Sequence, residues 1–231
     1  MRSLNAVALR SHKYAALLAL LLVSLTVQSF DARAGAEGTL SDVLRTVLGV
    51  AIFIVIFERP RERVAMGTLL GAIVVIGWAR HVFAAGLDHT LQLALHTLIA
   101  LFLWGAVWVV LRDLFRAQVI GAENVLGAIC GYIIAGEAWT GINAITYLLI
   151  PAAYSINPEV SALLAEWHGR MALFSYYSFA QMVTIGYADV TPVRAPATTL
   201  SLLGALFGLF YTAIVVSQFV GLTQSRKSET P

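Results

Sequence analysis

Long runs of apolar residues divide the chain, and short polar segments separate them. A helix that crosses the hydrocarbon core of a bilayer needs roughly 17 to 25 mostly apolar residues. One further run, at about 171–183, is too short to span a bilayer. The pattern therefore predicts an all-α membrane protein with one short buried helix and six transmembrane helices, at about 14–30, 41–57, 64–83, 89–111, 124–151 and 196–222.

Composition supports a membrane protein and excludes other classes. The chain is 59% hydrophobic and 12% charged, which is more apolar surface than one small soluble core could bury. Its basic residues form short clusters between the apolar runs, so no nucleic-acid-binding face is expected. The sequence contains no nucleophile elbow and no phosphate-binding glycine loop. We expect a protein that is not an enzyme and has no cofactor and no soluble partner.

The basic clusters also predict an orientation in the membrane. Lys and Arg near the ends of spans are retained on the cytoplasmic side. A cytoplasmic N-terminus makes both termini cytoplasmic, and the size of the chain suggests a bacterial inner membrane. With this orientation ten of the fifteen basic residues lie inside, namely Arg2, Arg10, Lys13, Arg59, Arg61, Arg63, Arg112, Arg116, Arg226 and Lys227.

The first apolar run has a second interpretation. A basic start, an apolar stretch from Ala15 to Val27 and the sequence Ala32-Arg33-Ala34 also describe a cleavable signal peptide. In that case the mature protein has five transmembrane helices. We favour the retained helix, and the other spans keep the same orientation in both cases.

A distinctive motif lies between the last two predicted spans. Residues 176–192 read Tyr-Tyr-Ser-Phe-Ala-Gln-Met-Val-Thr-Ile-Gly-Tyr-Ala-Asp-Val-Thr-Pro. This segment resembles the pore loop of the potassium channel family, whose usual signature is Thr-Thr-x-Gly-Tyr-Gly-Asp. Val183 stands in place of a Thr, and Ala188 stands in place of the second Gly. The other motif positions agree, at Thr184, Ile185, Gly186, Tyr187 and Asp189.

The resemblance implies a pore module at 121–222 after an N-terminal transmembrane region at 1–120. The module would comprise an outer helix at about 124–151, a re-entrant pore helix at about 171–183, a filter at 184–189 and an inner helix at about 196–222, followed by a cytoplasmic tail at 223–231. One chain supplies one loop and four loops are needed for a ring, so we expect a homotetramer in the lipid bilayer. Potassium would bind the backbone carbonyls of Thr184, Ile185, Gly186 and Tyr187.

The filter sequence has a physical rationale and one weak point. Consecutive carbonyls face one axis only if some residues adopt left-handed backbone angles, which Gly186 does freely. Ala188 has a Cβ, and left-handed angles there would cost about 1 to 2 kcal/mol per subunit. Val183 removes a hydroxyl behind the filter. We therefore predict a potassium-selective channel, with a cation channel of relaxed selectivity and a non-conducting scaffold or auxiliary subunit as alternatives.

Residues around the loop are candidates for support and gating. Tyr176, Tyr177 and Val183 would support the filter from the pore helix. Glu137 lies inside an apolar span, where ionisable residues usually face protein or water. It would bind the pore helix from behind through Tyr176 or Tyr177, or be a satisfied packing residue.

The inner helix carries small and hydroxylic residues. Thr198, Thr199 and Ser201 would line the pore. Gly204 and Gly208 either permit close helix packing or act as a bend that opens the inner helix. The spans contain no ladder of Arg residues such as a voltage sensor needs, and residues 223–231 are too few for a cytoplasmic ligand-binding domain. We therefore expect no gating by voltage or by an attached domain.

Overall fold

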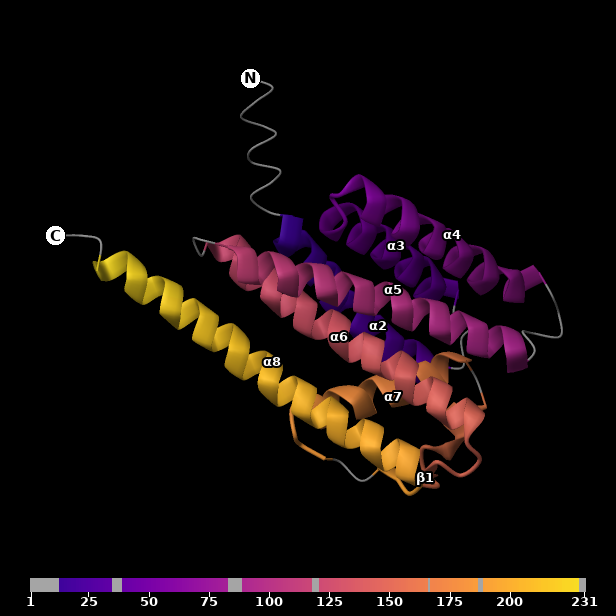
Figure 1. The fold of residues 1–231 in the computed structure, drawn as a ribbon. Helices are drawn as coiled ribbons and strands as arrows, with labels where there is room; N and C mark the ends of the chain where they lie inside the picture. The colour runs from indigo at the N-terminus through magenta and orange to yellow at the C-terminus, as the bar shows by residue number, and fades with distance from the viewer. Residues whose placement is uncertain are drawn as a thin grey trace.

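The computed structural model describes residues 13–34, 39–82, 89–117, 121–165, 167–186 and 189–228 (Figure 1). These residues are mostly helical, and a short 3-10 turn at Ser161–Leu164 and two three-residue strands complete them. The elements are α2 (Lys13–Ala34), α3 (Thr39–Ile56), α4 (Pro60–Val82), α5 (His89–Arg116), α6 (Ala122–Leu149), β1 (Tyr154–Ile156), α7 (Trp167–Met182), β2 (Val190–Pro192) and α8 (Ala195–Ser228).

Within the described residues, six helices are long and apolar enough to cross a membrane, namely α2, α3, α4, α5, α6 and α8. The seventh, α7, has only 16 residues and enters the bundle between α6 and α8. The prediction of an all-α, multi-pass membrane protein with a re-entrant helix before the last span is confirmed.

Several helix boundaries differ from those predicted by four residues or more. Helix α4 begins at Pro60 rather than near residue 64, because proline is well accommodated in the first turn of a helix. Helix α7 begins at Trp167 rather than near residue 171. Helix α8 continues to Ser228, so most of the predicted tail is helical. Hydropathy locates the apolar part of a helix, whereas Arg, Lys and Gln extend helices readily beyond it.

Helices α5 and α6 form the centre of the bundle, with α7 and α8 on one side and α3 and α4 on the other (Figure 1). The main core joins Ile52 of α3, Phe102 of α5 and Ile134 of α6. It extends to Met182 at the end of α7. The short helix is therefore anchored in the same core as the spanning helices.

The first segment, α2, packs inside this bundle. Leu17 and Leu21 are almost completely buried in the main core, and α2 contacts α3, α6 and α7. If the segment is retained, it forms part of the same core as the spanning helices; its retention stays a prediction.

Ion pairs connect the helix ends at one end of the bundle. Lys13 at the start of α2 pairs with Glu58 after α3 over 2.8 Å, and Arg112 near the end of α5 pairs with Glu62 in the first turn of α4. Helices α2 to α5 therefore alternate in direction, as membrane-crossing helices joined by short loops must.

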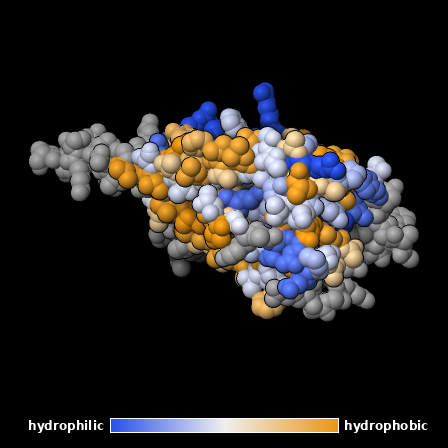
Figure 2. Space-filling model, turned by 90° about the horizontal axis from the view of Figure 1, so that it is seen from below, coloured by the Kyte–Doolittle hydropathy of each residue, from blue (hydrophilic) through white to orange (hydrophobic). Residues whose placement is uncertain are grey.

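Helix α8 presents an apolar face to the outside of the molecule. Figure 2 shows this face as a largely hydrophobic surface along the extended arm of the molecule. Such a surface suits a bilayer or a second copy of the chain. Its exposed large residues are Leu202, Leu203, Leu206, Leu209, Phe210, Ile214, Val216 and Val220.

Candidate functional site

Helix α7 ends deep inside the bundle, and the chain then returns to the end from which α7 started (Figure 1). The contact between Gly208 of α8 and Met182, the last residue of α7, shows how deep the short helix ends. A Cβ built on Gly208 would overlap the main chain of Met182. The last residue of α7 therefore lies beside a position well inside the spanning helix α8. Non-helical backbone at this depth is tolerated where it is buried in protein or lines a water-filled path.

The end of α7 has a Schellman motif with Thr184 in the left-handed position. The Thr184 N–H donates to the Gln181 carbonyl over 2.9 Å, and the Ile185 N–H donates to the Ala180 carbonyl over 2.9 Å. Thr184 has φ of 59°. Glycine is the usual residue at this position because it has no Cβ. The motif ends the helix and directs the chain back toward the surface.

Left-handed angles recur two residues later. Gly186 has φ of 66°, and Ile185 between the two has no positive φ. Alternation between left- and right-handed angles turns successive carbonyl groups toward one side of the chain. The sign of φ therefore alternates from Thr184 to Gly186, as it must where main-chain oxygens form a row.

Thr184 is the more informative of the two residues. Left-handed angles cost a residue with a Cβ about 1 to 2 kcal/mol, and a β-branched residue in this region is a genuine outlier. Such strain concentrates at functional sites. The sequence indicated this backbone role only for Gly186, so the role of Thr184 was missed.

An aromatic cluster holds α7 against α6, β1 and α8. Tyr177 is buried and its ring contacts those of Phe174 and Tyr154. Its hydroxyl lies 2.6 Å from the Ser201 hydroxyl of α8. Ser201 donates to the Ala197 carbonyl, so Tyr177 is the donor in this bond. Tyr177 thus connects the pore-helix candidate to the last spanning helix.

A buried polar chain also fixes the position of α7. The Tyr154 hydroxyl donates to the Asn143 side-chain oxygen over 2.9 Å, and the Asn143 amide donates to the Ser178 hydroxyl over 2.8 Å. Asn143 and Ser178 are fully buried. Buried polar groups need partners, so this chain of bonds fixes α6, β1 and α7 relative to one another. Sequence reasoning missed all three residues, although a polar Asn143 within an apolar span was a usable signal.

The outer end of the loop is held by a small antiparallel ladder. Strand β1 pairs with β2, with Ser155 opposite Thr191. The ladder continues beyond the strands, where the Asn157 N–H donates to the Asp189 carbonyl over 2.9 Å. The chain leaving the loop is therefore fixed to the segment that precedes α7.

Glu137 contacts α7, but through a residue other than those predicted. The Ser175 hydroxyl donates to Glu137 over 2.7 Å, so the expectation of a bond through Tyr176 or Tyr177 was wrong. Ser175 lies on the buried face of α7 that α6 covers, whereas Tyr176 is 43% exposed on another face. Glu137 supports the short helix from behind as expected, but its partner Ser175 is one residue before the predicted Tyr176.

On α8 the structure separates the predicted lining residues. Thr198 and Thr199 are exposed, whereas Ser201 is partly buried and faces α7. Gly204 and Gly208 are buried against Trp139 and Met182, respectively. Both glycines pack in a continuous helix here, and a bend at either remains a prediction.

The remaining candidate residues lie around the loop. Val183 is 45% exposed, and Thr184, Ile185 and Gly186 are exposed in the single chain. Tyr187 and Ala188 lie outside the described residues. Among the residues that the structure describes, no group of three or more His, Cys, Asp or Glu side chains is arranged for a metal ion. Within the described part of the loop, the oxygens that could bind an ion are those of the main chain, the Thr184 hydroxyl and the Asp189 carboxylate.

Comparison with known families agrees with the geometry of this region. Residues 161–225 match the family model described as ion channel. The match begins in the 3-10 turn and includes α7, the loop, β2 and most of α8. The search of curated proteins and the search of solved structures returned no match for the chain. The matched segment is therefore similar to an ion channel domain, and it lies within a multi-pass, all-α membrane protein.

Proposed function

We propose that four copies of this chain surround one axis and form a pore for passive, potassium-selective transport. The alternation of left-handed angles at Thr184 and Gly186 carries this proposal. It occurs at the end of a short helix between two spanning helices, within the part of the chain that matches ion channels. A row of aligned carbonyl groups can replace the water shell of a potassium ion.

The ion would bind the carbonyl oxygens of Thr184, Ile185, Gly186 and Tyr187, in a filter that continues through Ala188 to Asp189. Helix α7 would assist, because the carboxyl end of a helix carries partial negative charge that favours a cation. Tyr177, with Tyr176 and Val183 at the exposed side of α7, would support the filter.

Exposure of the loop supports the tetramer. One chain leaves Thr184, Ile185 and Gly186 exposed, and a single loop cannot surround an ion. The apolar outer face of α8 provides surface for contacts between copies and with lipid. Closed four-fold symmetry would bring four loops to one axis and bury these residues.

Position 188 makes relaxed cation selectivity the second candidate. If the two-residue alternation continued, residue 188 would also need a left-handed angle, at a cost of about 1 to 2 kcal/mol for alanine. Rotation of the preceding peptide would avoid this cost and alter the outer ion sites. Val183 also lacks the hydroxyl that a threonine would have at this position, and this loss would relax the selectivity further.

The basic clusters support an orientation with both termini in the cytoplasm and with α7 entering from the opposite face. Lys13 and Arg112 lie at the same end of the bundle, as the positive-inside rule requires. A bacterial inner membrane fits this arrangement. The absence of an Arg ladder in the sequence supports gating by a stimulus other than voltage.

Reconstitution in liposomes tests the proposal. Under opposed potassium and sodium gradients, we expect currents that reverse at the potassium equilibrium potential. Currents that reverse near zero would indicate relaxed selectivity, and no current in any cation would favour a scaffold. A native mass of four chains of 24.9 kDa each is expected for the assembly. A monomeric mass would contradict the pore.

A further inference from the structure

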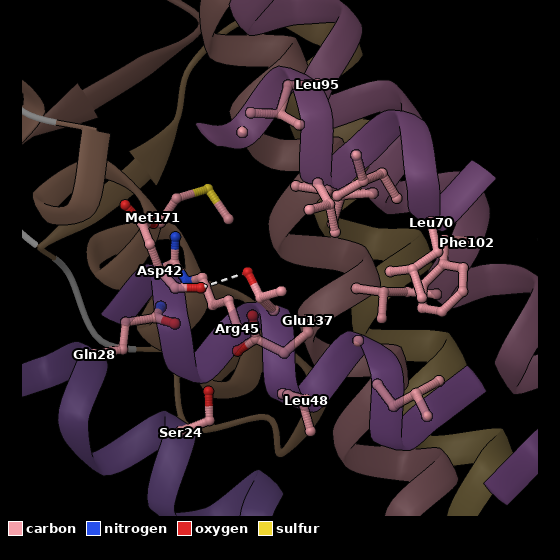
Figure 3. Close-up of a pocket in the computed structure, with 18 of the residues that line it drawn as sticks. Ser24, Gln28, Asp42, Arg45, Leu48, Leu70, Leu95, Phe102, Glu137 and Met171 are labelled. Atoms are coloured by element: carbon pink, nitrogen blue, oxygen red, sulfur yellow. Dashed lines mark hydrogen bonds between the residues drawn. The ribbon is translucent and has the colours of Figure 1, made fainter. Parts of the chain in front are cut away.

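A cavity lies behind α7, inside the N-terminal part of the bundle (Figure 3). Its volume is about 140 Å³, and residues from six helices, α2 to α7, line it. Most of the wall is apolar. Leu48 and Ile52 of α3, Leu70 and Ile73 of α4, and Phe102 of α5 form much of this part.

Polar side chains gather at one side of the cavity. Ser24, Gln28, Asp42, Arg45 and Glu137 lie together in Figure 3, away from Leu70 and Phe102. The cavity thus has a polar end and an apolar end, which is the distribution that an amphipathic ligand requires.

Gln28 provides an independent sign of a ligand. The side chain is only 5% exposed, and its amide nitrogen has no hydrogen-bond partner within the described ranges. A buried donor without a partner is unfavourable and rare in native structures. An oxygen acceptor placed in the cavity would satisfy this nitrogen.

The charges at the polar end limit the head group. Asp42 accepts a hydrogen bond from His168 over 3.1 Å, which offsets its negative charge when the histidine is protonated. Arg45 adds a positive charge to the same wall. Glu137 adds a second carboxyl group to this wall, so acidic and basic side chains roughly balance, and an uncharged oxygen head group such as a protonated carboxylic acid fits best.

We propose that this cavity binds a single-chain lipid of the fatty-acid type. Its oxygen head group would lie at Gln28 and Arg45, and its chain would extend among the apolar residues of α3, α4 and α5. Gly77 and Trp78 of α4 line the cavity, and α4 has no buried residue in its membrane-spanning window. A ligand that passes this thin wall must come from the bilayer, so it must be soluble in lipid.

The position of the cavity links the ligand to the loop. Glu137 lines it and holds Ser175 of α7, while Trp167 and Met171 line it directly from the start of α7. An occupied cavity would therefore shift or stiffen the helix that precedes Thr184. This regulation rests on the proposed channel function, whereas the binding itself does not.

Two glycines of α4 provide a matched pair of variants. A Cβ at Gly77 meets no atom within 4 Å, and a Cβ at Gly71 meets none either. Only Gly77 lines the cavity. Gly77→Leu should fill the space that the lipid chain needs, and Gly71→Leu should place the same side chain outside it.

Photo-crosslinking of the full chain in lipid nanodiscs tests the binding. The probe is palmitic acid with a diazirine in the middle of its chain, and mass spectrometry locates the cross-links. We expect cross-links at cavity residues of α3 to α5, reduced at least about ten-fold by Gly77→Leu and unchanged by Gly71→Leu. Equal labelling of the two variants, or cross-links confined to outward residues such as Val75, would overturn the proposal.

Further measurements identify the head-group contact and the source of the chain. Gln28→Leu should lower labelling about five-fold, the effect of losing one hydrogen bond. Competition by unlabelled palmitic acid alone would identify a free acid, and competition also by a diacyl phospholipid would identify one of its chains. If neither palmitic acid nor the phospholipid reduced cross-linking of the probe, the proposed lipid site would be wrong.

Regulation is measured separately. Where the reconstituted protein carries current, palmitic acid should change the current of the unmodified protein and of Gly71→Leu, but not that of Gly77→Leu. An equal response in all three would overturn the regulatory role. If no preparation conducts, the proposed channel fails, and the cross-linking result still decides the lipid site.

Discussion

The side-chain amide of Asn157 donates to the carboxylate of Asp189 over 3.3 Å, beside the main-chain bond between the same two residues. Asn157 is fixed in turn, because its side-chain oxygen accepts the Glu159 N–H over 3.1 Å. The last residue of the predicted filter is therefore held by the segment before α7. In the proposed pore this contact would determine the position of the outer mouth.

Asn157→Ala should destabilise the outer end of the loop. It removes the side-chain bond to the Asp189 carboxylate and the bond from the Glu159 N–H, and it leaves the main-chain bond intact, so we expect a loss of about 1 to 2 kcal/mol per subunit. Single-channel recording should show shorter open bursts, most clearly at low external potassium. Ser155→Ala, an exposed position of β1, is the control. Identical bursts in the two variants would show that Asn157 does not hold the mouth.

Asn143→Leu should destabilise the folded chain more than Tyr154→Phe. The leucine leaves the hydroxyls of Ser178 and Tyr154 without their partner, and each unsatisfied buried group costs about 1 to 3 kcal/mol. Tyr154→Phe leaves only one acceptor of Asn143 unpaired. Thermal unfolding in detergent should rank the two variants in this order. A double variant no worse than Asn143→Leu alone would show that the residues act as one chain, whereas additive losses would contradict it.

Tyr154 also predicts a dependence on pH. Burial raises the pKa of Tyr154 above its usual value near 10, and the neighbouring Tyr177 adds to the shift. A phenol with a raised folded pKa contributes stability that is complete below the unfolded pKa and is lost as the pH rises toward the folded value. Stability should therefore decrease above about pH 10. Tyr154→Phe should remove this part of the decrease, and an unchanged pH profile would contradict it.

The spanning helices could be predicted because the bilayer imposes a simple rule on the sequence. A run of apolar residues of sufficient length must be a helix there, since no other open segment satisfies its backbone in lipid. The short helix and the loop could be predicted from the length of one run and from the motif around Gly186.

Contacts between distant segments could not be predicted in the same way. The pairing of β1 with β2 and the bonds of Asn143 depend on how α6 and α7 are rotated about their axes. A rotation of one residue, about 100° on a helix, decides between Ser175 and Tyr176 as the partner of Glu137. Hydropathy contains no such information in a helix that is buried on several sides.

The backbone role of Thr184 was missed for a different reason. Residue-type rules assign left-handed angles to glycine, and a strained threonine becomes visible only in the folded chain. The hydrogen bonds at the end of α7 provide the compensation, and these depend on where the helix ends.

Gly186→Ala should abolish selective conduction. A Cβ at Gly186 meets no atom within 4 Å of the single chain, so the cost there comes from the left-handed backbone, about 1 to 2 kcal/mol per subunit. Reversal potentials of Gly186→Ala in liposomes should move from the potassium equilibrium value toward zero, or the current should vanish. Preserved selectivity would show that φ at this residue does not determine the ion sites.

Ala188→Gly should have the opposite effect. Glycine adopts left-handed angles without the cost to a residue with a Cβ, so the variant should raise single-channel conductance or thermal stability. Ala188→Val, with a larger β-branched side chain, should lower both. If glycine and valine give the same conductance and stability as alanine, the strain assigned to position 188 does not exist.

Gly204 and Gly208 offer a test that separates helix packing from helix bending. A Cβ at Gly208 would overlap the main chain of Met182, which cannot move without displacing the end of α7. A Cβ at Gly204 would lie 3.4 Å from the Gln181 side chain and 3.7 Å from Trp139, which are ordinary contacts. Gly208→Ala should therefore lower thermal stability by about 1 to 3 kcal/mol through overpacking, and Gly204→Ala should be nearly neutral.

A bend would give a different pattern. Alanine stiffens a helix at either position, so a gate that bends at these glycines should lose open probability in both variants, including the one whose stability is unchanged. Open probability measured beside thermal stability therefore distinguishes the two roles. Loss of both quantities in Gly208→Ala alone supports close packing of α8 on α7. Loss of open probability in a fully stable Gly204→Ala supports the bend, because the added methyl group there displaces nothing.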